Sequence, residues 1–413
     1  MAAAEGRPRF EVADVVRAHA DDYRRVHHPS AAQEAVLRHI AECRTAALGG
    51  HLEECDSCGH QRIAYNSCRD RHCPKCQSTA QAEWITARLE RLLPIPYFHV
   101  VFTIPTELNP LALRNRKVIF DILFAAASQT LLTVGRNEKH LGAQLGFTTV
   151  LHTWGQNLLF HPHLHCVVTG GGLSSDGVKW VPAKENYLLP VKVLGKLFRG
   201  KFLAALDTAY RDGRLDLEGS SAALSAPDEW HRFKNALYEK NWVVYAKPPF
   251  GGAEQVFHYL GRYTHRIAIS NHRIIDFADG KITFSWKDYA DNCRKKRMTL
   301  EAEEFLRRFL LHVLPHGFVR IRHYGICASG NVNTKLAAAQ RLLEPDIEPQ
   351  PHSPAEPSNE TSPSWWERFF EQTGIDVMSC PCCSAGRMHR LRCLSSDEIA
   401  SLAALLAGKA NTS

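Results

Sequence analysis

The segment Phe160-His-Pro-His-Leu-His-Cys-Val-Val-Thr169 decides the fold that we expect for this 413-residue chain. Its apolar second half is typical of a buried β-strand, and side chains alternate between the two faces of a strand. His163 and His165 therefore point to one face, and Leu164 points to the other, into a core. Two imidazoles on one face can bind one metal ion; the alternative is that they are structural histidines beside a loop. We interpret them as metal ligands.

A third ligand is expected from the preceding strand, which we predict over residues 146–154. If this strand forms a hairpin with the histidine-bearing strand, His152 lies roughly opposite the two histidines. His161 and Gln156 are the alternative third ligands. A site with three protein ligands leaves positions open for substrate oxygens, as a catalytic metal requires.

The surrounding sequence predicts an α+β fold, an antiparallel sheet flanked by helices. Apolar runs and helical periodicity predict further strands near 97–104, 163–169, 242–246 and 318–324, a hairpin over 272–286, and helices within 10–47 and near 78–93, 111–134, 191–211, 253–265 and 300–313. The glycine run at 170–172 is expected to close the histidine-bearing strand. We expect an N-terminal helical and zinc-ribbon domain over 1–93, a catalytic domain over 94–343, a linker over 344–364, and a small cysteine-rich C-terminal tail over 365–413.

Two short cysteine pairs lie in a segment with little periodicity, Cys55-Asp-Ser-Cys58 and Cys73-Pro-Lys-Cys76. Each pair aims two thiolates at one point, so we expect Cys55, Cys58, Cys73 and Cys76 to form one closed tetrahedral site for structural zinc. Metal binding would supply the folding energy that this segment cannot draw from a hydrophobic core. Cys68, His60 and His72 are possible substitutes for one ligand.

The sequence allows one alternative function for the N-terminal cysteines and a second zinc site in the C-terminal tail. His51-Leu-Glu53 followed by Cys73-Pro-Lys-Cys76 echoes the signature of zinc deaminases, but His72 stands where that signature has proline, and Cys55 and Cys58 would have no purpose. The tail could form a second zinc knuckle with an open choice among Cys380, Cys382, Cys383, His389 and Cys393.

The formal charge is +7, and the basic residues cluster, which favours a polyanionic partner. Arg69, Arg71 and Lys75 lie in the cysteine-rich loop and could contact phosphates, although this loop could also serve only to dock onto the next domain. Further basic groups lie at 294–297 and 320–323. We find no apolar run long enough to span a bilayer and no signal peptide, so we expect a cytoplasmic, nucleoid-associated protein.

The segment from Gln255 to His265 holds two tyrosines, Tyr259 and Tyr263, which share one face if the segment is helical. Two aromatic residues on one face of a helix are usually buried in a core. Arginines such as Arg262 and Arg266 are unusual next to a buried helix face. A tyrosine hydroxyl needs nearby positive charge to act as a phenolate. Its attack on a phosphodiester conserves the bond energy, so a cut strand can be rejoined.

These motifs together resemble the IS91 family of insertion-sequence transposases, within the HUH endonuclease superfamily. The resemblance covers nearly all of residues 1–343 and includes the cysteine module, the His161-Pro-His-Leu-His165 motif, the glycine run, the Tyr259-Leu-Gly-Arg-Tyr263 segment and the Arg322-His-Tyr-Gly325 stretch. It implies that His163 and His165 hold Mg²⁺ or Mn²⁺ on a central strand, with His152 fitting a three-histidine arrangement by spacing.

The resemblance also implies a reaction. Tyr259 and Tyr263 would be the two nucleophiles of a Y2-type transposase, Arg262 and Arg266 would contact DNA, and single-stranded DNA would be cut and rejoined through 5′-phosphotyrosine links in rolling-circle-like transposition. Two other functions remain open. A relaxase or replication initiator would use the same chemistry, and a zinc-containing DNA-binding regulator would bind DNA without cutting it.

Overall fold

The computed structural model describes residues 8–76, 91–247, 268–289, 291–344, 376–383 and 385–402, together with Glu367 and Phe370. Contacts divide the chain into two units. The first unit comprises Met1–Thr86, His265–Val313 and Pro357–Ser413, and the second comprises Ala87–Thr264 and Leu314–Glu356. We describe each unit by itself.

The first unit begins with two helices, α1 (Val12–Val26) and α2 (Ala31–Glu42). Ser30 caps α2, because its side chain accepts a hydrogen bond from the backbone of Gln33 while the Gln33 side chain accepts one from the backbone of Ser30. Such a reciprocal cap satisfies two donors that the first turn of a helix leaves open. Both helices expected within residues 10–47 are therefore present.

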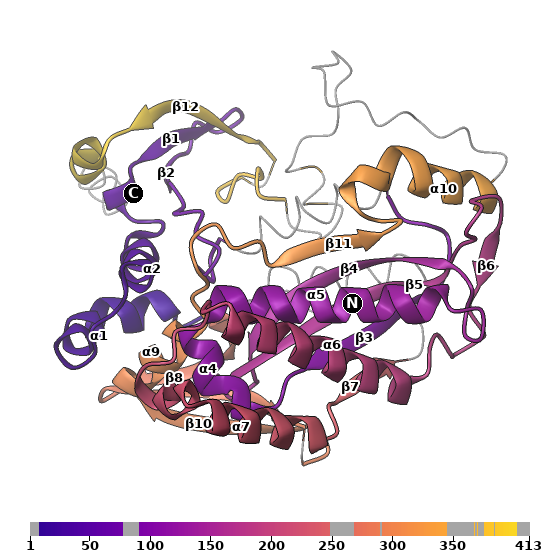
Figure 1. The fold of residues 1–413 in the computed structure, drawn as a ribbon. Coiled ribbons are helices and arrows are strands. Elements are labelled where there is room, and N and C mark those ends of the chain that lie inside the picture. The colour runs from indigo at the N-terminus through magenta and orange to yellow at the C-terminus, as the bar shows by residue number, and fades with distance from the viewer. Residues whose placement is uncertain are drawn as a thin grey trace. The chain divides into compact units, whose positions relative to one another are not determined.

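Two three-stranded antiparallel sheets complete the first unit. One has the order β12-β1-β2 and the other has the order β10-β9-β8. Their elements, with the helix that packs beside the second sheet, are β1 (Gly50–Cys55), β2 (Gln61–Tyr65), β12 (Met388–Leu394), β8 (Ile274–Ala278), β9 (Lys281–Asp288), β10 (Arg294–Glu301) and α9 (Ala302–Leu310). Figure 1 shows the yellow β12 beside the indigo β1, although more than 300 positions separate them in sequence.

The second unit is built on a six-stranded antiparallel sheet with the order β11-β4-β5-β3-β7, in which β6 pairs with β5. The elements are β3 (Tyr97–Thr103), α4 (Asn109–Arg114), α5 (Arg116–Arg136), β4 (Gln144–Trp154), β5 (Phe160–Leu173), β6 (Trp180–Pro182), α6 (Val191–Arg211), α7 (Pro227–Glu239), β7 (Val244–Lys247), β11 (Ile321–Gly325) and α10 (Ala337–Leu343). The histidine-bearing strand β5 is central, and antiparallel sheets flanked by helices confirm the predicted fold class.

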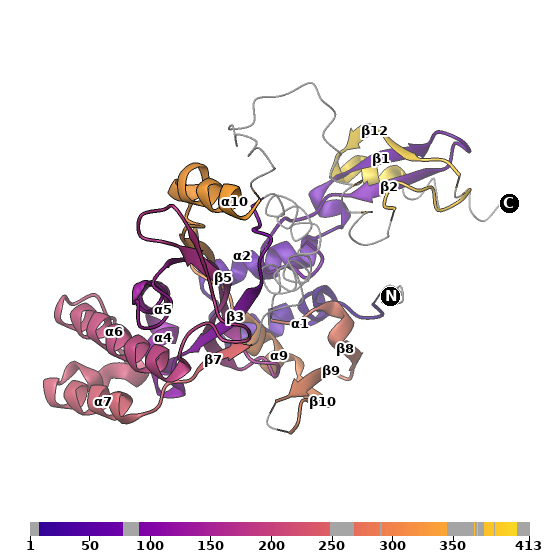
Figure 2. The same ribbon diagram turned by 90° about the vertical axis from the view of Figure 1, so that its right-hand side faces the viewer.

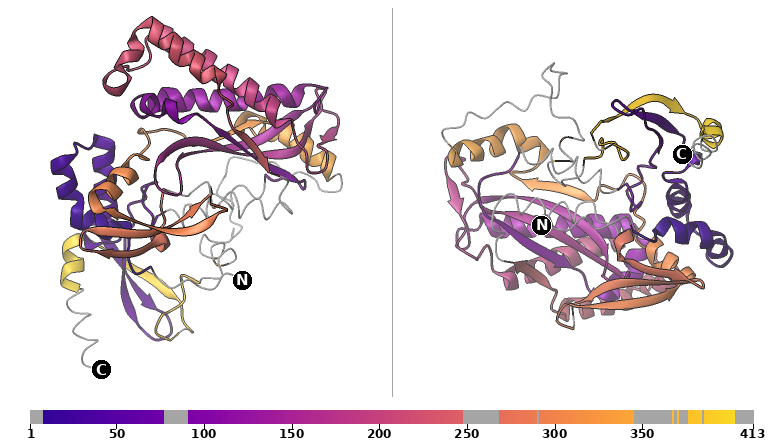
Figure 3. Two further views of the ribbon diagram at one scale, coloured as in Figure 1. Left: turned by 90° about the horizontal axis from the view of Figure 1, so that it is seen from below. Right: turned by 180° about the vertical axis from the view of Figure 1, so that it is seen from behind.

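Helices α5 and α6 pack side by side on one face of this sheet, as Figures 2 and 3 show. The Phe102 ring on β3 lies 4.9 Å from the Phe198 ring on α6, and Phe160 on β5 contacts Phe120 on α5. Phe102 is paired in register with Leu164. Since side chains alternate along β5, His163 and His165 point to the face opposite these helices.

The sequence predicted that the glycine run at 170–172 would end β5, and this prediction is wrong. The strand continues through the glycines to Leu173. A Cβ atom on Gly170 would lie 2.5 Å from the carbonyl oxygen of Pro96, and one on Gly172 would lie 2.6 Å from that of Gln144. These distances are too short for any side chain, so the glycines allow neighbouring backbones to approach β5 from both sides.

Contrary to our expectation from sequence, one helix, α5, is apolar and long enough to cross a membrane. However, 67% of its most apolar window is buried in the protein. Ile119, Phe120, Leu123 and Phe124 are fully covered, which is the behaviour of a core helix in a folded domain.

The contact-defined units differ from the expected domain ranges. Strands β8–β10 and helix α9 belong to the first unit rather than to the unit that carries the histidines. Val12 donates its backbone N–H to the Asn271 side chain, and Gln33 bonds the carbonyl of Leu310. The C-terminal segment, expected as a separate tail, also joins the first unit through β12.

Candidate active site and zinc module

Three histidines from two paired strands meet on one face of the second unit's sheet. His152 on β4 lies opposite His163 on β5, and His165 follows two residues later. One ring nitrogen from each of the three lies within 4.8 Å of the others. The expected hairpin pairing is therefore observed, and the group that it assembles contains His152 and not His161.

The hydrogen bonds of His163 leave one of its nitrogens available as a ligand. Its Nδ1 donates to the main-chain carbonyl oxygen of His161 at 2.6 Å, which places the proton on Nδ1 and a lone pair on Nε2. The Nε2 atoms of His163 and His165 are 3.0 Å apart. Nitrogens bound at about 2.1 Å to adjacent positions of one octahedral ion would be about 3.0 Å apart, so this spacing is that of neighbouring metal ligands.

A fourth histidine, which the sequence analysis missed, supports this group from behind. His99 on β3 is 3% exposed, and its Nε2 lies 2.8 Å from Nδ1 of His165. If His99 accepts the proton of that Nδ1, Nε2 of His165 is left to face His163. Ligating histidines commonly hold their second nitrogen in this way. The signal that could have revealed His99 is a single polar residue within the apolar run Tyr97–Thr103.

Removal from water keeps His99 and His163 neutral at neutral pH. Removal from water lowers the pKa of His99 to about 3, with Lys247 and His163 contributing by repulsion. The same desolvation lowers the pKa of His163 to about 4. Because only a neutral imidazole can bind a metal, the low pKa of His163 favours ligation at neutral pH, and a neutral His99 can accept the proton of Nδ1 of His165.

Tyr259 and Tyr263 lie outside the described residues, as do Arg262 and Arg266. Their position relative to the histidines therefore stays a prediction.

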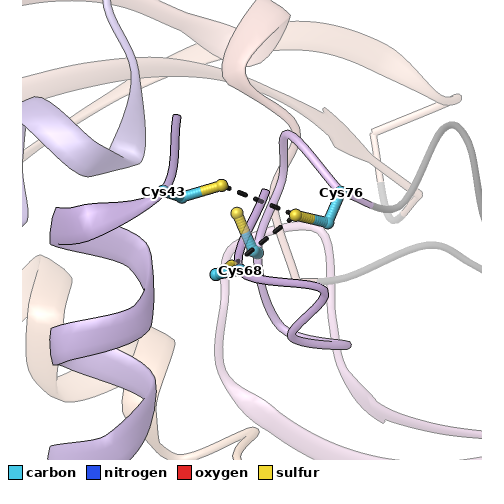
Figure 4. A group of neighbouring side chains, drawn as sticks. Cys43, Cys68 and Cys76 are labelled. Carbon is cyan, nitrogen blue, oxygen red and sulfur yellow. Dashed lines mark hydrogen bonds between the residues drawn. The ribbon is translucent and has the colours of Figure 1, made fainter. Parts of the chain in front are cut away.

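Four cysteines of the first unit form a compact group, in which Cys43 follows the last residue of α2 and Cys68, Cys73 and Cys76 lie in the loop after β2. Sγ of Cys76 lies 3.5 Å from that of Cys43 and 3.6 Å from that of Cys68, and Figure 4 shows these sulfurs pointing toward one another. All four sulfurs lie within 4.8 Å, as a tetrahedral ligand set requires.

The single site expected from Cys55, Cys58, Cys73 and Cys76 is wrong. Each short pair stays together, but the two pairs belong to different groups. Cys73 and Cys76 meet Cys43 and Cys68, whereas Cys55 and Cys58 meet Cys380 and Cys383. The physical reason is that Cys55 ends β1 and Cys58 lies in the turn that leads to β2, which carries this pair away from the loop after β2. Cys68, considered as a substitute, is a full member of its group, and Cys43 was missed.

Charged residues brace the loop that holds the first cysteine group. Asp70 contacts Nδ1 of His39 at 2.8 Å and Nδ1 of His72 at 3.0 Å. Although burial raises the pKa of Asp70, the hydrogen bonds from the two histidines hold it well below its ordinary value, so the carboxylate is ionised. Lys75 forms an ion pair of 2.9 Å with Glu11.

The predicted DNA-contacting residues of this loop differ in exposure. Arg69 is exposed and Arg71 is half-buried, while Lys75 is engaged with Glu11. Two further basic groups also have structural roles. Arg322 packs over the Phe124 ring and pairs with Asp121, and Lys296 pairs with carboxylates on both sides of the β9–β10 turn.

Comparison with known proteins agrees with this arrangement. The family described as "Transposase zinc-binding domain" matches residues 15–104, and the family described as "Putative transposase" matches residues 146–335. The first match contains the whole Cys43–Cys76 group, and the second contains His152, His163 and His165. The fold and the two sites thus define a transposase that has an N-terminal zinc-binding domain.

Two relatives extend the match over most of the chain. "Putative transposase y4qJ" of Sinorhizobium fredii is 49% identical over 92% of this chain and 94% of its own length. The transposase for insertion sequence element IS801 of Pseudomonas savastanoi pv. phaseolicola is 29% identical over 77% of this chain and 76% of its own length. The chain belongs to the IS91 family of transposases, which confirms the resemblance seen in the sequence.

Among solved structures, the conjugative relaxase TrwC in complex with oriT DNA is similar at 15% identity and a TM-score of 0.24, over 40% of this chain and 71% of the relaxase chain. This likeness is too low to carry an argument about the present protein.

Proposed function

We propose that this transposase cuts and rejoins single-stranded DNA, using Tyr259 and Tyr263 as nucleophiles and a divalent ion held by His152, His163 and His165. The observation that carries the proposal is the group of three histidines on the paired strands β4 and β5. Their ring nitrogens lie within 4.8 Å of one another, His99 contacts His165, and their face of the sheet is opposite the packed helices α5 and α6.

The donor set bears on which ion would fit. Three imidazole nitrogens suit borderline ions better than Mg²⁺, which prefers oxygen ligands and keeps several waters. Of Mg²⁺ and Mn²⁺, we therefore expect Mn²⁺ to bind more tightly here. When bound, the ion would polarise the scissile phosphate and offset the charge that develops on it.

The tyrosines would carry the covalent step. The phenolic oxygen of one tyrosine attacks phosphorus, the bond from phosphorus to the 3′ oxygen breaks, and that oxygen leaves as a 3′ hydroxyl with a proton. The product is a 5′-phosphotyrosine, and attack by a 3′ hydroxyl reverses the step and rejoins a strand. A second tyrosine allows a second cut while the first still holds a DNA end. Arg262 and Arg266 would stabilise the phenolate and contact the phosphate.

The zinc module would contribute to DNA binding rather than to chemistry. Arg69 and Arg71 would contact DNA phosphates, and such contacts position the protein on DNA without recognising the base sequence. Lys75 would contribute less, because its ion pair with Glu11 offsets its charge. A protein of this kind would act in the cytoplasm, at the nucleoid.

The test is a covalent adduct assay with end-labelled single-stranded DNA from an element end and Mn²⁺ or Mg²⁺. We expect a protein–DNA adduct that survives denaturation, and peptide mapping should place the DNA on Tyr259 or Tyr263. The double change Tyr259→Phe with Tyr263→Phe should abolish the adduct while DNA binding is retained. An adduct that persists in the double variant would contradict the tyrosine mechanism. Binding without any adduct in the unchanged protein would favour a non-catalytic regulator.

His99 provides a second prediction within this function. Changing His99 to leucine removes the group that holds Nδ1 of His165, and loss of such a partner costs about 10- to 100-fold in metal affinity. We expect Mn²⁺ affinity, measured by calorimetry, to fall by that factor. His99→Gln, which keeps an acceptor near the position of Nε2, should recover most of it. Equal affinities for the two variants would show that His99 only fills space.

A further inference from the structure

We propose that Cys55 and Cys58 from the N-terminal module and Cys380 and Cys383 from the C-terminal segment form a second structural zinc site. This site lies partly outside residues 15–104, the range matched by the zinc-binding family. It is independent of the proposed cleavage chemistry.

The spacing of the four sulfurs is that of a zinc tetrathiolate. Sγ of Cys55 lies 3.7 Å from that of Cys383, and Sγ of Cys58 lies 3.7 Å from that of Cys380. All four lie within 4.8 Å of one another. Four sulfurs at about 2.3 Å from a tetrahedral zinc ion are about 3.8 Å apart, so the observed edges match that geometry.

Other occupants fit less well. A disulfide requires sulfurs about 2.05 Å apart, far closer than these pairs. A multi-iron cluster would spread the four sulfurs beyond the space that they enclose here. A single ion with a preference for four thiolates remains, and zinc is the usual one in structural sites.

Both cysteine pairs have the local geometry of metal-binding turns. Backbone N–H groups point at the sulfurs: Ser57 donates to Cys55 at 3.4 Å, Cys382 donates to Cys380 at 3.3 Å, and Gly386 donates to Cys383 at 3.4 Å. Such donors stabilise the thiolate form that a metal requires.

Asp56 joins the two turns directly. Its carboxylate accepts the backbone N–H of Arg387 at 2.8 Å and contacts His389 at 3.2 Å. His389, a possible ligand by sequence, is thus occupied with Asp56. A Cβ atom on Gly386 would lie 2.4 Å from Sγ of Cys55, so only glycine lets the C-terminal turn approach this closely.

The sheet that surrounds the second cysteine group also joins the N-terminal and C-terminal segments. β12 pairs with β1 from Met388 to Leu394, with one register shift between Leu52 and Glu53, and β1 is the central strand of this sheet. Among the described residues, few apolar side chains are buried here: Met388 packs against the second cysteine group, and Leu394 and Ile399 pack on Leu52. So small a core rarely holds a segment in place alone, and a metal ion would supply what is missing.

The experiment counts zinc per chain by native mass spectrometry and elemental analysis. The parent protein is the full chain with His163→Ala and His165→Ala, so that only cysteine sites can hold zinc. We expect two zinc ions per parent chain. Changing Cys380 and Cys383 to serine should leave one zinc ion per chain. Changing Cys55 and Cys58 to serine should also leave one zinc ion per chain.

If both cysteine pairs bind the same zinc ion, the zinc losses caused by the two double changes do not add up in the quadruple variant. The variant with all four serines should still hold one zinc ion, because both pairs serve the same site. The matched control changes Cys382 and Cys393 to serine, since both are exposed and lie outside the group. It should keep two zinc ions. One zinc ion in the parent, lost on changing Cys55 and Cys58 but not Cys380 and Cys383, would overturn the proposal in favour of a single N-terminal site.

A second measurement needs no cysteine variant and so does not depend on their folding. Cys58 is exposed, as are Cys382 and Cys393. With zinc present, iodoacetamide should modify Cys382 and Cys393 rapidly and Cys58 slowly, and a strong chelator should remove the protection. Burial cannot explain protection of an exposed thiol. If Cys58 reacts as fast as Cys382 before chelation, it has no metal and the proposal fails.

Discussion

Changing His163 and His165 together to alanine is expected to lower the rate of single-strand cleavage by about 10³-fold or more. The two changes remove two of three imidazoles that lie within 4.8 Å of one another, leaving His152 alone. A catalytic ion contributes several kcal/mol to stabilising charge in the transition state. A loss of about 4 kcal/mol corresponds to about 10³-fold in rate.

The measurements are adduct formation on labelled single-stranded DNA and calorimetric Mn²⁺ binding. Circular dichroism should be unchanged, because His163 and His165 are only half-buried and the apolar face of β5 stays intact. DNA binding should also persist. Full cleavage by the double variant would show that the histidines hold no catalytic ion.

Single variants then separate the third ligand from its neighbour. His152→Ala should weaken Mn²⁺ binding strongly, whereas His161→Ala should weaken it little, because His161 contributes its main-chain carbonyl and not its ring to the hydrogen bond with His163. The reverse result would assign the third position to His161.

The histidine group could be predicted from sequence because its geometry is almost entirely local. Alternation along one strand fixes the common face of His163 and His165. The short connection between β4 and β5 leaves little freedom of register, so His152 falls opposite His163. His99 could not be placed in the same way, because β3 reaches β5 only through a non-local pairing.

The cysteine sites show where local reasoning stops. Spacing correctly groups Cys55 with Cys58 and Cys73 with Cys76, since each pair shares one turn. Which pairs meet is decided by strands that join distant parts of the chain. Cys43 follows a helix and has no partner at short spacing in its own segment, so nothing near it in sequence marks it as a ligand.

Charge-rich strands explain why the contact-defined units differ from the expected domain ranges. β10 begins with four basic residues, and β12 carries Arg390 and Arg392, so neither has the apolar alternation that predicts a strand. Both lie at the edge of a sheet, where charged side chains are common because they oppose aggregation. Without these strands, the sequence gives no reason to join 265–313 or the C-terminal segment to the N-terminal helices.

Changing Cys73 and Cys76 to serine is expected to unfold the loop after β2 and to lower sharply the temperature at which the first unit unfolds. In the described part of this loop, residues 66–76, the buried residues are Cys73 and Cys76 themselves. A structural zinc site contributes about 10–16 kcal/mol to folding, comparable to or above the total stability of a domain, about 5–15 kcal/mol. The few apolar contacts of the loop cannot replace that contribution.

Calorimetry and zinc analysis of the full chain would test this expectation, with the exposed Cys293 changed to serine as the matched control. The control should keep its zinc and both transitions. The Cys73 and Cys76 variant should lose one zinc ion, and its first unit should unfold at a lower temperature, while the second unit, which has its own sheet and core, should unfold as before. If Arg69 and Arg71 contact phosphates, the same variant should bind single-stranded DNA more weakly and with a smaller dependence on salt, because fewer counterions are released. An unchanged transition after loss of zinc would mean that the module is held by its apolar contacts, and an unchanged salt dependence would remove this loop from the DNA interface.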